Sequence, residues 1–199
     1  MPEANLSSNT LHVSFIGQTK SKSVSVFDSD FVGNLIHMEA LVGTLLKYGN
    51  TGKYEPYLAE RWIANDKKTI YKFFIKNDIY DESDVKIDSD SYLASLTFLL
   101  GIYSKSYNPP VFDLLIGWSE FKKNPNVKIK GLISNKVDNS IEFHFEKSTS
   151  GLYEFLSMPY YGYYNLNDFN ADGTWKDNLK ITASAGYRII SAVMTEFIA

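Results

Sequence analysis

The chain has 199 residues, of which 44% are hydrophobic and 22% charged, and its net charge is −3. This composition is typical of a folded globular protein and excludes global disorder. The 20 Lys and Arg residues form no basic stripe, which argues against nucleic acid as a partner. The absence of cysteine excludes disulfides, thiolate metal sites and cysteine nucleophiles. No apolar run approaches the roughly 20 residues of a membrane-spanning helix, so we expect no direct membrane insertion.

The first part of the chain predicts one strand and one long helix. Residues 11–16 alternate between apolar and polar side chains, as a half-buried strand does. Residues 31–48 carry apolar residues at helical spacing, and Ser29 or Asp30 is suited to cap the helix. Gly49 is the expected helix end, because glycine adopts the left-handed conformation that follows many helices.

A β-hairpin is predicted next, from Trp62 through a turn at residues 65–68 to a strand at residues 69–76. Tyr71, Phe73 and Ile75 fall on one face of the second strand, because side chains alternate with a period of two. Asn and Asp suit the turn, since both tolerate left-handed backbone and bond their own main chain.

The remaining elements alternate between short helices and strands. Asp88 or Ser89 caps a helix at residues 91–103, and the pair of prolines at 109–110 separates it from the next element. The other predicted elements are a helix at 112–121, strands at 127–134 and 140–146, a helix at 151–157, an extended segment at 160–165 and a final strand at 186–191.

Two adjoining blocks give the sequence a family resemblance. The first is Pro56-Tyr57-Leu58-Ala59-Glu60-Arg61-Trp62, and the second is Tyr71-Lys72-Phe73-Phe74-Ile75-Lys76, which follows a short polar turn. Their order resembles the N-terminal lobe of bacterial extracellular solute-binding proteins of family 5, the peptide/nickel type that serves ABC importers. Weaker similarity continues at residues 90–95, 127–146 and 186–188. The sequence departs from the family pattern before the second helix and at Ala185-Gly186-Tyr187, where the family has Gly-Pro-Tyr.

The resemblance implies a fold of the mixed α+β / α/β class. We expect a lobe like those of type II periplasmic binding proteins, with a mixed sheet flanked by helices and an inserted, hairpin-rich subdomain. Residues 1–48 and 182–199 would form the sheet domain, and residues 49–181 the insertion. Family members are much longer, so we expect this chain to be a fragment of a two-lobed protein that lacks the second lobe. We also expect a periplasmic or cell-envelope location, with the export signal absent from this sequence.

The function that the resemblance implies is binding of a solute, an oligopeptide by preference, for an ABC-type importer. No enzymatic activity and no cofactor are implied, and the partners would be the solute and a membrane permease. The chain would form one wall of the ligand cleft. The candidate ligand-binding residues are Phe27, Asp28, Phe31, Val32, Tyr107, Trp118 and Tyr187. Residues such as Phe27 and Trp118 are more often found in a core, and residues such as Asp28 and Asp30 more often cap a helix, so these alternatives stay open.

Residues 168–173 match the first half of a calcium-binding loop. Asp168, Asn170 and Asp172 place oxygen donors at alternate positions, and Gly173 provides the sharp turn. The twelfth position of such a loop needs a carboxylate, and Leu179 stands there instead. An Asn/Asp/Gly-rich surface loop explains the same residues, and we expect no metal site.

Two other functions remain open from the sequence. The same lobe could serve as the extracytoplasmic sensing or interaction module of a receptor. An enzyme with a carboxylate pair, such as a glycosidase, would need two acids facing each other across a cleft. The acids at residues 78–90 are better explained as a solvated loop and a helix start. No G-x-S-x-G motif and no metal-binding histidine spacing occur.

Overall fold

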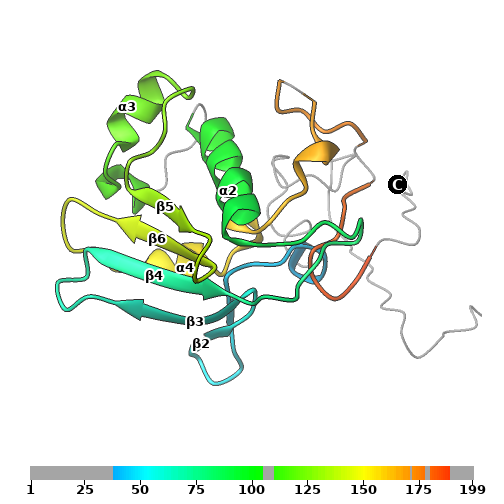
Figure 1. Cartoon of the computed structure of the whole chain (residues 1–199), viewed down its shortest axis with the longest axis horizontal. Coiled ribbons are helices and arrows are strands. Elements are labelled where there is room, and N and C mark those ends of the chain that lie inside the picture. Colours follow the sequence, from blue (N-terminus) through cyan, green and yellow to red (C-terminus); the bar gives the residue numbers. More distant parts are fainter. Residues whose placement is uncertain (1–37, 105–109, 171, 178–179, 189–199) are drawn as a thin grey trace, which may run out of the picture.

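The computed structural model describes residues 38–104, 110–170, 172–177 and 180–188, with only the backbone of Tyr103. Short helices and antiparallel strands alternate along it, which confirms the mixed class of the fold (Figure 1). The elements are β1 (Leu46–Tyr48), β2 (Tyr54–Pro56), β3 (Ala59–Ala64), β4 (Ile70–Ile75), α2 (Ser89–Tyr103), η1 (Phe112–Leu114), α3 (Trp118–Lys123), β5 (Leu132–Asn135), β6 (Ser140–His144), α4 (Leu152–Phe155), η2 (Pro159–Tyr161) and η3 (Leu166–Asp168).

The hairpin formed by β3 and β4 agrees with the sequence prediction. The strands pair antiparallel, with Trp62 opposite Phe73. The side chain of Asn65 closes the turn, because its Oδ1 accepts hydrogen bonds from the backbone N–H groups of Thr69 and Ile70. Lys68 adopts a φ of 53° in the same turn. The register therefore places alternate residues of β4 on the inner face of the sheet.

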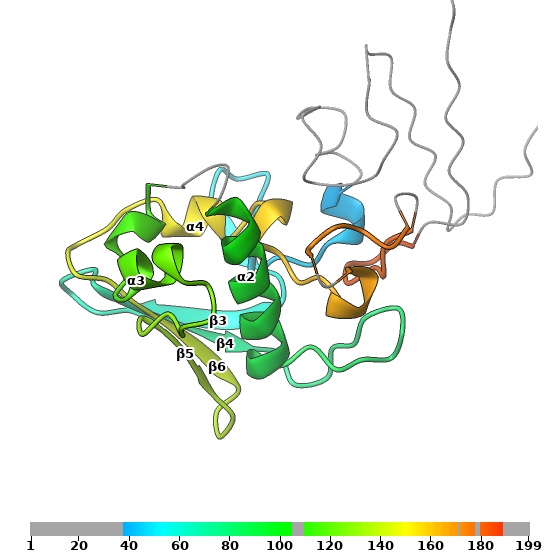
Figure 2. The same cartoon turned by 90° about the horizontal axis from the view of Figure 1, so that it is seen from above.

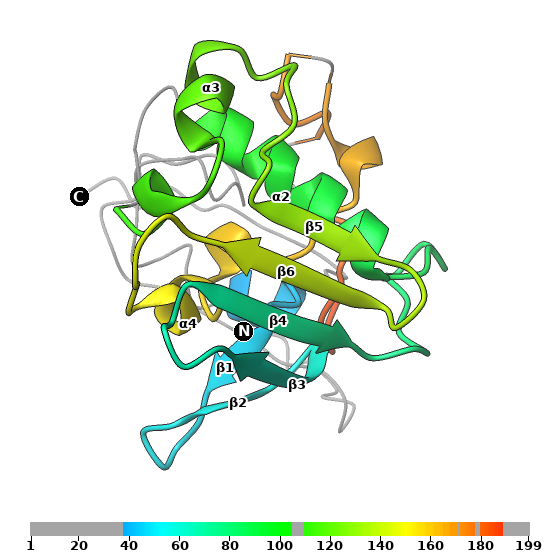
Figure 3. The same ribbon diagram turned by 60° about the vertical axis from the view of Figure 1, so that its left-hand side comes forward.

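The principal sheet has four strands in the order β3-β4-β6-β5, all antiparallel (Figure 3). Its inner face carries the buried Tyr71, Phe73 and Ile75, as predicted, together with Ile141 and Phe143. Helix α2 packs across this face, mainly over β5 and β6. The rings of this face meet edge to face, as between Phe73 and Phe143, an arrangement that aromatic quadrupoles favour.

Helix α2 begins where the sequence predicts. The carboxylate of Asp88 accepts hydrogen bonds from the N–H groups of Asp90 and Ser91, and the Ser91 hydroxyl accepts one from the N–H of Asp88. This reciprocal capping satisfies backbone donors that would otherwise have no partner. The helix then buries Tyr92 and Leu96 against the rest of the core.

The long helix predicted at residues 31–48 is wrong in its second half. Residues 38–41 are helical, but residues 42–45 belong to no helix, and the chain enters strand β1 at Leu46. Gly49 does not end a helix; it lies in the β1–β2 turn, where its N–H donates to the carbonyl of Lys53. The apolar residues from Leu41 to Leu46 are buried, as expected, but mostly not from a helix.

The helix predicted at residues 112–121 is also wrong as a single element. The chain turns at Leu115, which bridges to Phe145, and then at Gly117, which has a φ of 84°. A Cβ on Gly117 would lie 2.8 Å from the backbone nitrogen of Lys130, so glycine allows this close approach. The result is the 3-10 turn η1 followed by the short helix α3.

The second hairpin and the end of the chain match the prediction in part. Strand β5 begins at Leu132, five residues later than predicted, and the β5–β6 turn contains Asn139 at a φ of 48°. Residues 160–165 begin inside the 3-10 turn η2 before becoming extended. Residues 186–188 form no strand, and the rest of that predicted strand lies outside the described residues, as does the strand at 11–16. The division into residues 1–48 with 182–199 and residues 49–181 stays a prediction.

Candidate functional site

The described segments farthest apart in the sequence meet at one place, which we call the junction. It comprises residues 40–43, Tyr57, Asp81 and Glu82, residues 163–165 and residues 182–187. Figure 2 shows the helical turn at 38–41, the loop before α2 and the residues near 180–188 gathered on one side of α2, away from α3. The junction contains Tyr187, a predicted ligand residue that is 49% exposed. Among the predicted ligand residues that the structure describes, Tyr187 alone is exposed.

The centre of the junction is the buried carboxylate of Asp81, which is 4% exposed. Its Oδ1 accepts hydrogen bonds from the N–H groups of Ser83 and Val85 at 2.9 and 3.0 Å. Its Oδ2 accepts from Asn165 Nδ2 at 2.8 Å and from the Tyr163 hydroxyl at 3.3 Å. Burial, and then the charge of Asp81, hold the pKa of Tyr163 well above its ordinary value, so this tyrosine stays protonated and donating.

Ser184 joins the two ends of the junction. Its hydroxyl accepts a hydrogen bond from the N–H of Gly43 at 2.8 Å and donates one to the carbonyl of Tyr163 at 2.9 Å. Gly43 is required here, because a Cβ would lie 2.7 Å from the carbonyl oxygen of Ser184. The Gly43 carbonyl also accepts from the N–H of Tyr163. These contacts fix three distant segments in one arrangement.

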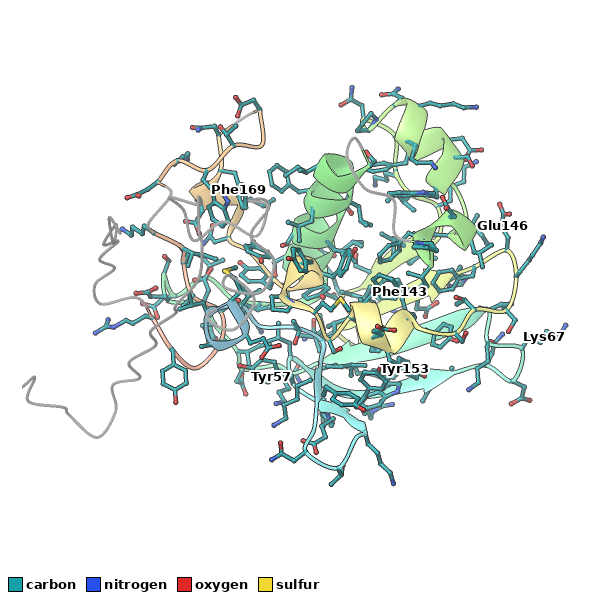
Figure 4. All side chains as sticks on the ribbon, turned by 180° about the vertical axis from the view of Figure 1, so that it is seen from behind. Tyr57, Lys67, Phe143, Glu146, Tyr153 and Phe169 are labelled. Carbon is teal, nitrogen blue, oxygen red and sulfur yellow. The ribbon has the colours of Figure 1, made fainter. Side chains whose placement is uncertain are left out.

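Two tyrosines bring the junction to the surface. Burial raises the pKa of the Tyr57 hydroxyl, and the nearby backbone of Gly186 opposes this rise. Tyr187 donates its backbone N–H to the carbonyl of Ala40. Figure 4 shows Tyr57 near this edge of the molecule, apart from the sheet core around Phe143 and Tyr153. The junction thus offers a ligand phenolic rings and hydroxyl groups.

The other predicted ligand residues are not brought to the junction. Trp118 begins α3 on the far side of α2 and is 1% exposed, packed on Phe112 and Phe121. In this position it is a core residue, the alternative that the sequence left open. The other five, Phe27, Asp28, Phe31, Val32 and Tyr107, lie outside the described residues. The ligand-binding roles of all seven stay predictions.

The oxygen donors of the calcium-like loop are occupied by the loop and its neighbour. Asp168 accepts from the N–H and hydroxyl of Thr182, and Asp172 accepts from the N–H and hydroxyl of Thr174. The Asn170 amide donates to the Thr174 hydroxyl. Among the residues that the structure describes, no group of three His, Cys, Asp or Glu side chains could hold a metal ion.

The sequence interpretation of the acids at 78–90 as a solvated loop was wrong for Asp81. Its burial depends on Tyr163 and Asn165, which lie 82 and 84 residues away, so no local signal could reveal it. The other acids have separate structural partners. Asp88 caps α2, and Asp90 binds Ser134 and Lys136. The described part of the chain also contains no helix long and apolar enough to cross a membrane.

No known family model and no curated protein matches the sequence, but solved structures match the fold. A periplasmic oligopeptide-binding protein from Borrelia burgdorferi matches 85% of this chain and 34% of its own, with a TM-score of 0.68 and 16% identity. The substrate-binding domain of an oligopeptide ABC transporter from Bacillus anthracis matches 81% of this chain and 32% of its own, with a TM-score of 0.66 and 14% identity. OppA from Haemophilus influenzae, solved with the peptide RPPGFSPFR, matches 82% and 33%, with a TM-score of 0.64 and 11% identity.

These comparisons confirm the resemblance at the level of the fold. The chain has the fold of part of an ABC-transporter substrate-binding protein of the oligopeptide type. It spans about a third of the length of the solved structures that it matches.

Proposed function

We propose that this chain forms one wall of the ligand cleft of a solute-binding protein that serves an ABC importer, and that the solute is an oligopeptide. The observation that carries the proposal is the fold, which is shared over about four fifths of the chain with proteins described as oligopeptide-binding. The location that follows is the periplasm or cell envelope, and the partner is a membrane permease. The reaction class is binding and release, without chemical change of the solute.

The junction is the part of the described surface that suits this role best. An extended peptide is bound mainly through its backbone, with its side chains in tolerant pockets, so the protein must supply fixed polar groups and apolar faces. Tyr57 and Tyr187 supply rings and hydroxyls at one edge, and their backbone N–H groups donate to the carbonyls of Leu45 and Ala40. We propose that Tyr187 contacts the bound solute directly.

One wall presents about half of the contacts of a two-walled cleft. Association costs free energy because rigid-body motion is lost and side chains become ordered, and the rigid-body part of this cost is the same whether one wall or both walls bind the peptide. We therefore expect the isolated 199-residue chain to bind peptides weakly, and the native protein that contains it to bind them tightly.

Thermal-shift and calorimetric titrations of the native protein test the proposal. The ligands would be a library of short peptides, with free amino acids, sugars and metal chelates as controls. We expect peptides alone to raise the melting temperature, and Tyr187→Ala to weaken binding about tenfold, the loss of about 1.4 kcal/mol. Exclusive binding of a non-peptide solute would refute the oligopeptide assignment. Absence of binding to every class would refute the solute-binding role.

A further inference from the structure

Residues 182–187, which we call the strap, are hydrogen-bonded along most of their length although they form no helix or strand. Five of their six backbone N–H groups, those of Thr182, Ala183, Ser184, Ala185 and Tyr187, donate to an acceptor elsewhere in the chain. The acceptors, in order, are the carboxylates of Asp168 and Glu82, the carbonyl of Leu41 for two successive residues and the carbonyl of Ala40.

Two of these acceptors are carboxylates that accept hydrogen bonds from adjacent residues of the strap. Asp168 accepts from both the N–H and the hydroxyl of Thr182, each at 2.8 Å. Glu82 pairs with Ala183 in both directions, because its own N–H donates to the Ala183 carbonyl at 2.8 Å and its Oε2 accepts from the Ala183 N–H at 3.2 Å. Hydrogen bonds to charged acceptors are about twice as strong as those between neutral groups. The two carboxylates therefore hold the start of the strap.

Little apolar surface holds the strap in place. Its first five residues are Thr, Ala, Ser, Ala and Gly, whose small side chains bury little area even where they are fully covered. Since the hydrophobic contribution follows the apolar area removed from water, it is small here. The side chains that hold the strap come from two separate elements, the loop before α2 and η3, rather than from a neighbouring strand.

We propose that the strap is a releasable conformational element, which opens as a unit while the four-stranded sheet stays folded, and that Asp168 and Glu82 keep it closed. Local opening of this kind is expected where few apolar contacts and many individual hydrogen bonds hold a segment. Opening would release the Gly43 N–H from Ser184, separate Gly186 from Tyr57 and displace Tyr187 (Figure 2). This inference does not depend on the proposed ligand.

Hydrogen exchange measured by mass spectrometry on the whole chain tests the proposal. The variants are Asp168→Ala and Glu82→Ala. The matched control is Asp172→Ala, because Asp172 lies in the same loop as Asp168 but accepts its hydrogen bonds from Thr174. We expect Asp168→Ala to accelerate exchange of all strap amides by at least about tenfold, and Glu82→Ala by less because Glu82 is exposed. Amides of β4 and β6 should exchange as in the wild type, and the control should leave the strap unchanged.

Three results would overturn the proposal. Faster exchange limited to the single amide that lost its acceptor would show separate bonds rather than one element. Equal acceleration of β4 and β6 would show that the strap opens only when the whole chain unfolds. An equal effect of Asp172→Ala would show that the carboxylate contacts are not specific. If a variant fails to fold, hydrogen exchange of the wild-type chain in mild urea tests the proposal instead. The proposal requires a lower opening free energy for the strap amides than for the sheet amides.

Discussion

Substitution of Gly43 by alanine probes the most crowded point of the junction. An added Cβ would lie 2.7 Å from the carbonyl oxygen of Ser184 and 2.9 Å from both methyl carbons of Leu58. Leucine methyls can rotate away, but the Ser184 carbonyl belongs to a backbone held on both sides by hydrogen bonds. The backbone must therefore move, and the bond from the Gly43 N–H to Ser184 must lengthen or break.

The cost follows from this geometry. Overpacking of a tight site costs about 1–3 kcal/mol, and replacing glycine with alanine returns about 0.4–1 kcal/mol through the unfolded chain. We expect a net loss of about 2 kcal/mol. For a chain of this size each kcal/mol shifts the melting temperature by about 2–4 °C, so the variant should melt about 4–8 °C below the wild type.

Urea denaturation and calorimetry of the chain measure this loss, with Gly186→Ala as the matched control. Gly186 lies in the strap, as Ser184 does, yet a Cβ there would meet nothing within 4 Å. The control should therefore be neutral or slightly stabilising.

 The φ of Gly186 also lies outside the left-handed region, so alanine fits its backbone. Equal stability of the wild type and Gly43→Ala, or equal losses in both variants, would refute the reasoning about crowding at Gly43.

Three further predictions concern the sheet and helix α2. Tyr92→Phe should cost about 0.5–1.5 kcal/mol in urea denaturation, because the hydrogen bond that the buried Tyr92 hydroxyl donates to the carbonyl of Tyr161 would be lost. Asp88→Ala should cost about 1 kcal/mol and reduce helicity measured by circular dichroism, because the cap of α2 is lost. The pKa of Glu142 is lowered, first by its hydrogen bond to His144, so its stabilisation is complete above the ordinary pKa of 4.5 and is lost as the pH falls through the lowered value. Acid titrations followed by fluorescence should therefore show a steeper loss of stability in the wild type than in Glu142→Gln.

The elements that the sequence predicted correctly are those whose determinants lie close together. The β3–β4 hairpin is specified by the alternation of Tyr71, Phe73 and Ile75 and by a turn that Asn65 closes with residues four and five positions away. The start of α2 depends on Asp88 and its immediate neighbours. Such short-range interactions are visible in a single sequence.

The errors occur where a distant segment decides the local conformation. The apolar spacing from Leu41 to Leu46 fits a helix, but the Gly43 N–H donates to Ser184, which is 141 residues away, instead of taking part in a helix. The same holds for the junction, because Asp81 is buried by partners that lie more than 80 residues along the chain. The family resemblance was enough to propose Tyr187 as a ligand residue, but the sequence did not reveal the residues that position Tyr187.

The most direct test of the central claim is a hydrogen-exchange footprint of the native protein with and without a bound peptide. If this chain forms a wall of the peptide cleft at the junction, the peptide should slow exchange in the segments around Tyr57 and Tyr187. Exchange at the exposed outer face of the sheet, for example around Ile133, should stay the same. Protection confined to segments outside the junction, with Tyr57 and Tyr187 unaffected, would contradict the account.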